Sequence, residues 1–138
     1  MLVIYPVQNE ERKNALCAAC GVTPRPGCFC YQAYDRETPD AADGTFLGVC
    51  QFDIGEAGTV YDLRNAEGVE DEEALFIMGR QALNFIDLCG AHYAFFDPQS
   101  PITDKLLYWL GFSHKTGKWE MNLEHFFEEP CKHKTPEA

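Results

Sequence analysis

The chain has 138 residues, which fits one domain, and a domain of this length buries about two thirds of the surface that its unfolded chain exposes. It carries 22 acidic and 11 basic side chains, a formal net charge of −11. Nucleic acids and anionic membranes bind clustered Lys and Arg, so this charge argues against both kinds of partner. No apolar run approaches the roughly 20 residues of a membrane-spanning helix. The start of the chain lacks the basic and apolar segments of a signal peptide, so we expect a cytoplasmic protein with reduced thiols.

The first part of the chain predicts a strand, a helix and a second strand. Residues 1–7 are mostly apolar and include the β-branched Val3 and Ile4, which is typical of a strand. Asn9 is a good helix cap, and the helix is expected to run to Cys20 and to stop at Gly21. A loop rich in Pro and Gly follows, and residues 28–35 then form the second strand.

Residues 46–54 and 59–64 are predicted to form a β-hairpin. Apolar side chains alternate along the first segment, as they do in a strand with one face buried. The connection contains Gly55 and Gly58, which suit a tight turn. The hairpin places two further strands next to each other in the sheet.

The strongest helical pattern covers residues 71–89. Apolar side chains recur at three- and four-residue spacing, Asp71 can cap the helix, and Gly90 can end it. Phe76 and Ile77 widen the apolar face, so we expect this helix to be mostly buried.

A short strand and a short helix are predicted next. Residues 92–96 are an apolar run that suits a central strand. Ser100 followed by Pro101 is a cap with proline at the first helical position, which predicts a helix over 102–110. Gly111 then ends that helix.

Residues 115–118 suit a hairpin tip, and residues 119–123 alternate as a last strand. The chain therefore reads as a single domain over 1–127 followed by a polar tail, 128–138. Hairpins and helical crossovers both occur, so the sheet must be mixed. We predict an α/β (α+β) fold with a mixed, mostly antiparallel sheet of six to seven strands and helices on both faces.

Two motifs in the second half carry a family resemblance. Gly90 precedes the apolar strand, and the short helix ends in Leu-Tyr-Trp-Leu-Gly-Phe, residues 107–112, before a hairpin. Together with the order of elements, this resembles the GNAT superfamily of acetyl-CoA-dependent N-acetyltransferases. Residues 44–123 carry the resemblance, and the N-terminal part shares only the order of elements. The resemblance implies a GNAT-like acyltransferase fold, acetyl-CoA as cofactor, and a small-molecule or peptide amine as acceptor, in a monomer or homodimer.

In that family, acetyl-CoA lies between two splayed parallel strands. Its pyrophosphate lies on backbone N–H groups at the start of the long helix, where unpaired donors and a partial positive charge favour anions. The resemblance therefore implies cofactor-binding roles for Leu63, Arg64, Gly68, Val69, Glu72 and Ala74.

The turn before the long helix departs from the family pattern. The family usually has Gln/Arg-x-x-Gly-x-Gly/Ala, whereas residues 69–74 here read Val-Glu-Asp-Glu-Glu-Ala. Only Ala74 fits; Val69 and Glu72 stand where a polar or basic residue and the first glycine belong. The carboxylates compete with phosphate for the same donors and repel it, which weakens binding by roughly tenfold or more. An alternative is thus a catalytically degenerate GNAT-like binding or regulatory module with weak or no CoA binding.

The resemblance also implies a carboxylate base on the strand before this turn and a tyrosine acid on the short helix. Asp62 matches the base, with Asp53 as the second choice; the alternative for both is a solvent-facing strand residue. The tyrosine position of the family holds Leu107 here. Tyr108 is adjacent, about 100° round the helix, and is the candidate acid, with packing as the alternative. His92 is expected to be a hydrogen-bonded structural histidine.

Cys17, Cys20, Cys28 and Cys30 place four thiols within fourteen residues. The first two share one helix face, and the last two point to the same side of a strand. We expect packed thiols and no metal, because free cysteine behaves as a small apolar side chain. The alternative is a tetrahedral zinc site with four thiolate ligands.

Overall fold

The computed structural model describes residues 1–41, 44–97 and 101–127. Within them lie the strands β1 (Leu2–Pro6), β2 (Phe29–Asp35), β3 (Thr45–Ile54), β4 (Gly58–Asn65), β5 (Tyr93–Phe96), β6 (Ser113–Lys115) and β7 (Lys118–Asn122). The helices are α1 (Glu10–Ala19), α2 (Glu72–Leu88) and α3 (Asp104–Leu110). The predicted order of elements is confirmed, and their ends differ from the predicted ones by one or two residues.

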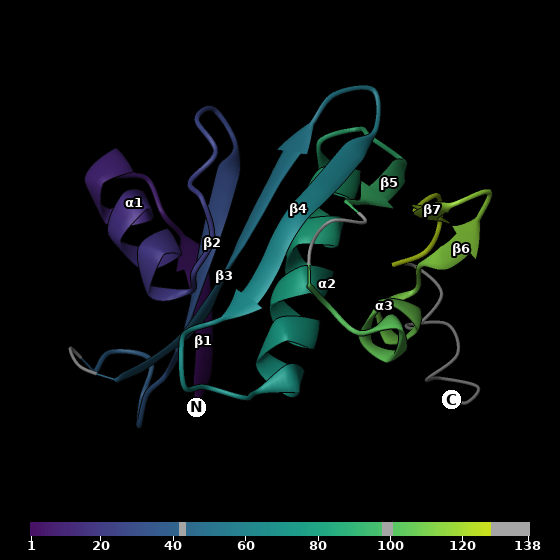
Figure 1. The fold of residues 1–138 in the computed structure, drawn as a ribbon. Coiled ribbons are helices and arrows are strands. Elements are labelled where there is room, and N and C mark those ends of the chain that lie inside the picture. The colour runs from purple at the N-terminus through teal and green to yellow at the C-terminus, as the bar shows by residue number, and fades with distance from the viewer. Residues whose placement is uncertain (42–43, 98–100, 128–138) are drawn as a thin grey trace.

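The strands form one sheet in the order β1-β2-β3-β4-β5-β7-β6 (Figure 1). β4 and β5 run parallel, and the other neighbouring pairs of described strands are antiparallel. α2 is the crossover of the parallel pair, because parallel neighbours need a long connection. The predicted mixed, mostly antiparallel sheet is therefore confirmed.

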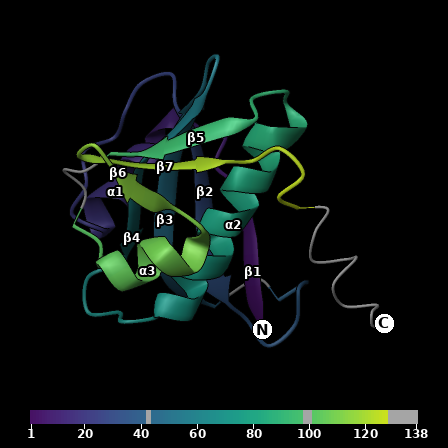
Figure 2. The ribbon, with the colours of Figure 1, turned by 90° about the vertical axis from the view of Figure 1, so that its right-hand side faces the viewer.

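Helices cover both faces of the sheet, as predicted. α1 lies on one face, whereas α2 and α3 lie next to each other on the opposite face (Figures 1 and 2). The main core lies between α2 and the sheet and includes Phe52, Met78, Ile86 and Phe96, each at most 2% exposed. On the α1 side, no helix of the described residues covers β5 and β7 (Figure 1).

Local capping explains where the helices begin. The side chains of Asn9 and Asp71 accept hydrogen bonds from N–H groups in the first turns of α1 and α2, as predicted. The predicted start of α3 is wrong by two residues, because the Thr103 hydroxyl is the cap and accepts from Leu106 N–H. Ser100, the predicted cap, lies outside the described residues.

The outer side of α2 is more exposed than predicted. Ile77 is 38% exposed, and Leu88 is 74% exposed. Phe76 stacks on Trp109 of α3 with 4.1 Å between the ring centroids. Because the sheet covers one side of α2 and α3 covers only part of the other, apolar side chains remain at the surface.

Among the described residues, no helix is both long enough and apolar enough to cross a bilayer.

Candidate functional site

The parallel strands β4 and β5 pair over a short distance before they separate. Residues 58–60 pair with 94–96, and the next bond runs from Asp97 N–H to the Val60 carbonyl at 2.9 Å. β4 then continues to Asn65, whereas β5 ends at Phe96. Among the described residues, the second half of β4 therefore has a strand neighbour only on its β3 side.

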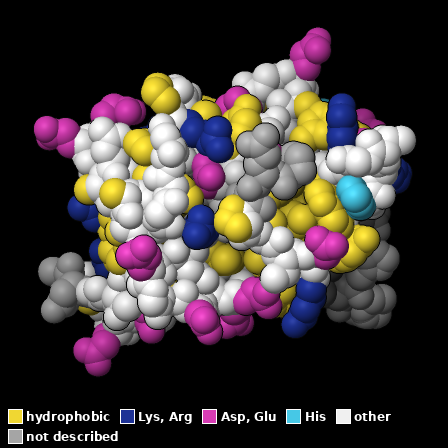
Figure 3. Space-filling view, viewed as in Figure 1, with side chains coloured by type: hydrophobic (Ala, Val, Ile, Leu, Met, Phe, Trp, Pro, Cys, Tyr) yellow, Lys and Arg dark blue, Asp and Glu magenta, His cyan; other side chains and the backbone are white. Residues whose placement is uncertain are grey.

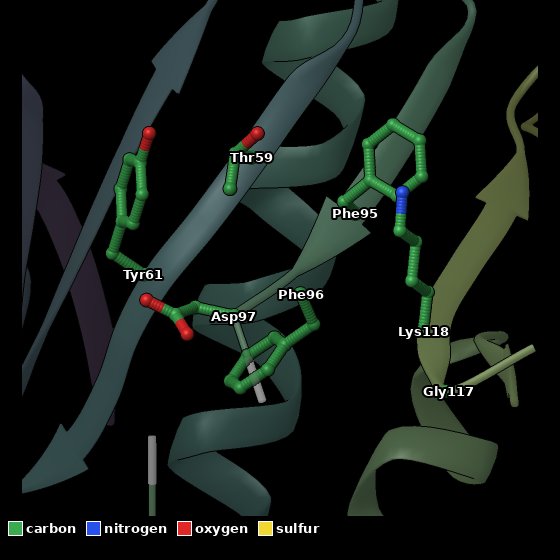
Figure 4. A pocket seen from close by; sticks show the side chains of 7 residues that line it. All are labelled: Thr59, Tyr61, Phe95, Phe96, Asp97, Gly117 and Lys118. Atoms are coloured by element: carbon green, nitrogen blue, oxygen red, sulfur yellow. The ribbon is translucent and has the colours of Figure 1, made fainter. Parts of the chain in front are cut away.

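A cavity of about 440 Å³ lies where the two strands separate, and we call it the strand cavity. Its lining comes from β4, from β5 and its end, and from the turn into β7: Thr59, Tyr61, Phe95, Phe96, Asp97, Gly117 and Lys118 (Figure 4). The space-filling view shows hydrophobic side chains gathered on the half of the α1 face that contains β5 and β7 (Figure 3). The cavity is thus an aromatic surface that carries one acidic and one basic side chain.

A β-bulge turns two consecutive residues of β4 to one face. The register of β3 against β4 shifts just after the pair Gln51–Asp62, which leaves Tyr61 as the extra residue. The Tyr61 hydroxyl donates to Asp53, and Asp62 accepts from Gln51. Asp53 and Gln51 are two residues apart on β3 and hence share a face. Regular alternation would have put Tyr61 and Asp62 on opposite faces.

Asp62, the predicted base, is the centre of a polar network. Arg25 Nε and Gln51 Nε2 both donate to Asp62 Oδ2, each at 2.8 Å. The Asp62 side chain is only 10% exposed, so it is not solvent-facing. The hydrogen bond to this carboxylate raises the pKa of Arg25. Asp62 is not among the described residues that line the strand cavity, and it holds Arg25 in place.

A buried lysine fixes loop 21–28 over this face of the sheet. Lys13 of α1 is 2% exposed, and its Nζ donates to the carbonyls of Arg25 at 2.5 Å and Cys28 at 3.0 Å. Gln51 adds two bonds, accepting from Arg25 N–H and donating to the Thr23 carbonyl. The Arg25 guanidinium then lies over the Tyr61 ring, 4.7 Å from its centroid. The loop thereby supports one wall of the strand cavity.

Tyr61 keeps its proton at neutral pH. Its hydroxyl donates to Asp53 Oδ2 at 2.8 Å, and this bond raises the pKa of Tyr61. Asp53, the second candidate base, is therefore occupied as the acceptor of that hydroxyl. The cavity consequently presents a protonated phenol from β4.

A second cavity, of about 420 Å³, lies at the start of α2, and we call it the helix-end cavity. It is lined by the end of β4, by α2 and by the segment before α3: Asn65, Glu70, Glu72, Leu75, Pro101, Ile102, Thr103 and Leu106. The Ala74 N–H in the first turn donates to the Asp71 carboxylate at 3.0 Å. With two glutamates in the lining and one helix-end donor already used, this chemistry opposes a polyphosphate group.

The predicted cofactor residues gather at this end of β4 and α2, in different settings. Leu63 and Ala74 are each 2% exposed, and their side chains belong to the core. Glu72 lines the helix-end cavity, whereas Arg64 and Val69 line an adjoining cavity of about 290 Å³. Gly68 has a φ of 83°, a turn conformation that favours glycine.

Tyr108, the predicted acid, lies elsewhere on the surface. It is 60% exposed, and its ring meets Trp119 edge to face, with 5.0 Å between the centroids. It is not among the described residues that line either cavity, and the neighbouring Leu107 is buried. His92 Nδ1 lies 2.6 Å from Asp87 Oδ1, a contact that agrees with a structural role.

The cysteines pack where α1 meets β2 and β3. Cys17 and Cys30 interact side chain to side chain, which lowers the pKa of Cys17. Burial raises the pKa of Cys20 to about 12. Cys20 and Cys30 pack with Val49 in a small apolar cluster, so the packing role is confirmed for these two. In the described part of the chain, no three His, Cys, Asp or Glu side chains form a group that could hold a metal ion.

Sequence reasoning missed the residues that β5 and β7 contribute to the strand cavity. Phe95 is the register partner of Thr59, so Asp97, two residues later, lies on the same face. Lys118 joins them through the pairing of β7 with β5. The alternation of Tyr93, Phe95 and Asp97 was the available signal, and it gives no hint of which strand lies beside it.

No known protein family matches this sequence, and no curated protein matches it at a significant level. The site is therefore interpreted from its own geometry and chemistry.

Proposed function

We propose that this protein is a GNAT-like N-acetyltransferase, which transfers the acetyl group of acetyl-CoA to an amine in the strand cavity. The observation that carries the proposal is the separation of the parallel strands β4 and β5, with a cavity where they part. Acetyl-CoA lies between such strands in the GNAT superfamily. The order of elements and the motif at residues 107–112 add support.

The proposed cofactor path follows the second half of β4. Thr59 and Tyr61 line the strand cavity at one end of this path, and Asn65 lines the helix-end cavity at the other. The thioester and the amine would meet in the strand cavity, and the phosphate-bearing part would lie towards the start of α2.

Acetyl transfer needs two proton movements. The ammonium must lose a proton before its nitrogen attacks the thioester carbonyl, and the departing thiolate takes up a proton as the C–S bond breaks. We assign the first role to Asp97, the carboxylate that lines the strand cavity. The thiolate takes its proton from water in this proposal, because the single hydroxyl proton of Tyr61 is donated to Asp53. In this proposal Asp62 is a positioning residue that holds Arg25, and Tyr108 packs against Trp119.

The acidic start of α2 favours a second candidate function. Glu70 and Glu72 line the cavity where a diphosphate would have to lie. A binding or regulatory module of the same fold, with weak or no CoA binding, fits that charge.

Thermal unfolding with acetyl-CoA, CoA and S-acetylpantetheine tests both candidates. We expect stabilisation by millimolar acetyl-CoA, because a ligand that binds the folded state raises its apparent stability. Glu72→Gln removes repulsion of the diphosphate and should tighten acetyl-CoA binding by roughly three- to tenfold at low salt, with no change for S-acetylpantetheine. Glu11→Gln, in the first turn of α1, is the charge-matched control and should leave binding unchanged.

The outcomes separate the candidates. Absence of stabilisation at millimolar acetyl-CoA rejects the acetyltransferase. Stabilisation by acetyl-CoA, with no acetylated product from a panel of amines, supports the binding module.

A further inference from the structure

The strand cavity presents two aromatic rings on either side of a carboxylate. In Figure 4 the rings of Tyr61 and Phe95 stand apart, with Thr59 between them and the Asp97 carboxylate directed towards β4. These side chains come from two strands whose register places Thr59 beside Phe95. On this face of the sheet, no helix of the described residues covers β5 (Figure 1).

Both rings are held in place before any ligand arrives. The Tyr61 hydroxyl bonds Asp53, and the Arg25 guanidinium lies against the ring. Phe95 lies in a strand that pairs on both sides, and the Tyr93 ring meets it edge to face at 5.4 Å between centroids. A preformed gap between rings suits a flat aromatic group, because ring contacts add to the gain from burial.

The charges define the other end of the ligand. Asp97 is the acidic side chain in the lining, and it also interacts electrostatically with Arg25. A net charge of −11 adds an attractive field for cations. Lys118 lies on the side away from Asp97, with its Nζ 5.7 Å from the centre of the Phe95 ring (Figure 4). Lys118 is exposed and can turn towards solvent when a ligand ring occupies the gap.

We infer that the strand cavity binds arylalkylamines, with the aromatic ring between Tyr61 and Phe95 and the ammonium on the Asp97 carboxylate. As a statement about the acceptor, this inference rests on the proposed acetyl transfer. As a statement about binding, it can be measured without any cofactor.

The test compares three probes on the full chain by calorimetry and amide NMR. Phenethylamine has the ring and the charge, hexylamine lacks the ring, and 2-phenylethanol lacks the charge. We expect phenethylamine to bind and to shift the amide signals of Thr59 and Phe95. Hexylamine should bind roughly three- to tenfold more weakly, and 2-phenylethanol at least about tenfold more weakly.

Two variants assign these differences to side chains. Phe95→Leu should weaken the binding of phenethylamine but leave the binding of hexylamine nearly unchanged, a selectivity that general unfolding cannot produce. Asp97→Asn should weaken the binding of both amines and leave the binding of 2-phenylethanol unchanged. Glu37→Gln, at an exposed position in the loop after β2, makes the same change in net charge as Asp97→Asn and should alter the binding of none of the three probes.

The inference is overturned if phenethylamine does not bind at millimolar concentration, if the three probes bind equally, or if neither variant changes their ranking. Its failure can be distinguished from failure of the proposed function. Stabilisation by acetyl-CoA without phenethylamine binding overturns only the ligand class. Phenethylamine binding without stabilisation by acetyl-CoA overturns only the acetyl transfer.

Discussion

At the scale of single residues, Lys13 decides how loop 21–28 meets the sheet. Its ammonium is buried and bonds two loop carbonyls, those of Arg25 and Cys28. A buried charge without such acceptors would be strongly unfavourable. The sequence predicts this segment only as a loop, because a lysine on a short helix is usually a solvated side chain.

Replacing Lys13 with methionine should therefore lower the free energy of unfolding by about 2–3 kcal/mol, since two carbonyls lose a charged donor. Urea denaturation measures this change. Lys105→Met, at a side chain that is 82% exposed, should change the free energy by less than about 0.5 kcal/mol. Equal stability of the two variants would show that Lys13 does not hold the loop.

At the scale of elements, β4 and α2 approach closely at the start of β4. A Cβ atom added to Gly58 would lie 2.5 Å from Cγ2 of Ile86, a fully buried side chain of α2. Gly58 also pairs with Ala94 across the parallel strands. Its small size thus sets how β4, β5 and α2 fit together beside the strand cavity.

Gly58→Ala should reduce the free energy of unfolding by about 1–3 kcal/mol, because a packed core resists an added methyl group. Gly55→Ala, in the turn just before β4, is the matched control, since its added Cβ would lie 3.7 Å from the nearest atom. Guanidinium denaturation compares the two variants. A control that is as unstable as Gly58→Ala would refute the steric explanation.

At the scale of the whole molecule, buried thiols make the fold sensitive to alkali. Burial raises the pKa of Cys20 from 9.0 to about 12, and burial also raises the pKa of Cys50. Above pH 9 these thiols ionise in the unfolded chain while they stay protonated in the fold. The unfolded state then binds fewer protons, so stability falls as pH rises from about 9 to 12.

Denaturant titrations between pH 7 and pH 11 should show this loss, and Cys20→Ala should flatten the slope. Cys89→Ala, at an exposed thiol, should leave the slope as it is in the original protein. If stability is constant up to pH 11, the buried thiols do not control the alkaline limit.

The fold followed from local signals to a large extent. The caps at Asn9 and Asp71, and the glycine that ends α3 at Gly111, act within a few residues of themselves. Local signals predicted the residues of the site less well. A solvent-facing Asp62 was the alternative that the sequence left open, whereas the bulge at Tyr61 turns Asp62 to the face that loop 21–28 covers, where Arg25 bonds it.

The sequence by itself determined the order of helices and strands, the mixed sheet and the acidic start of α2, because periodicity, caps and turn residues are local properties. Only the tertiary structure decided that β4 and β5 separate after residues 60 and 96, and that Tyr61, Phe95, Asp97 and Lys118 line one cavity. Those contacts depend on which strands become neighbours and in what register. Strand pairing joins residues far apart in the chain, so no local pattern encodes it.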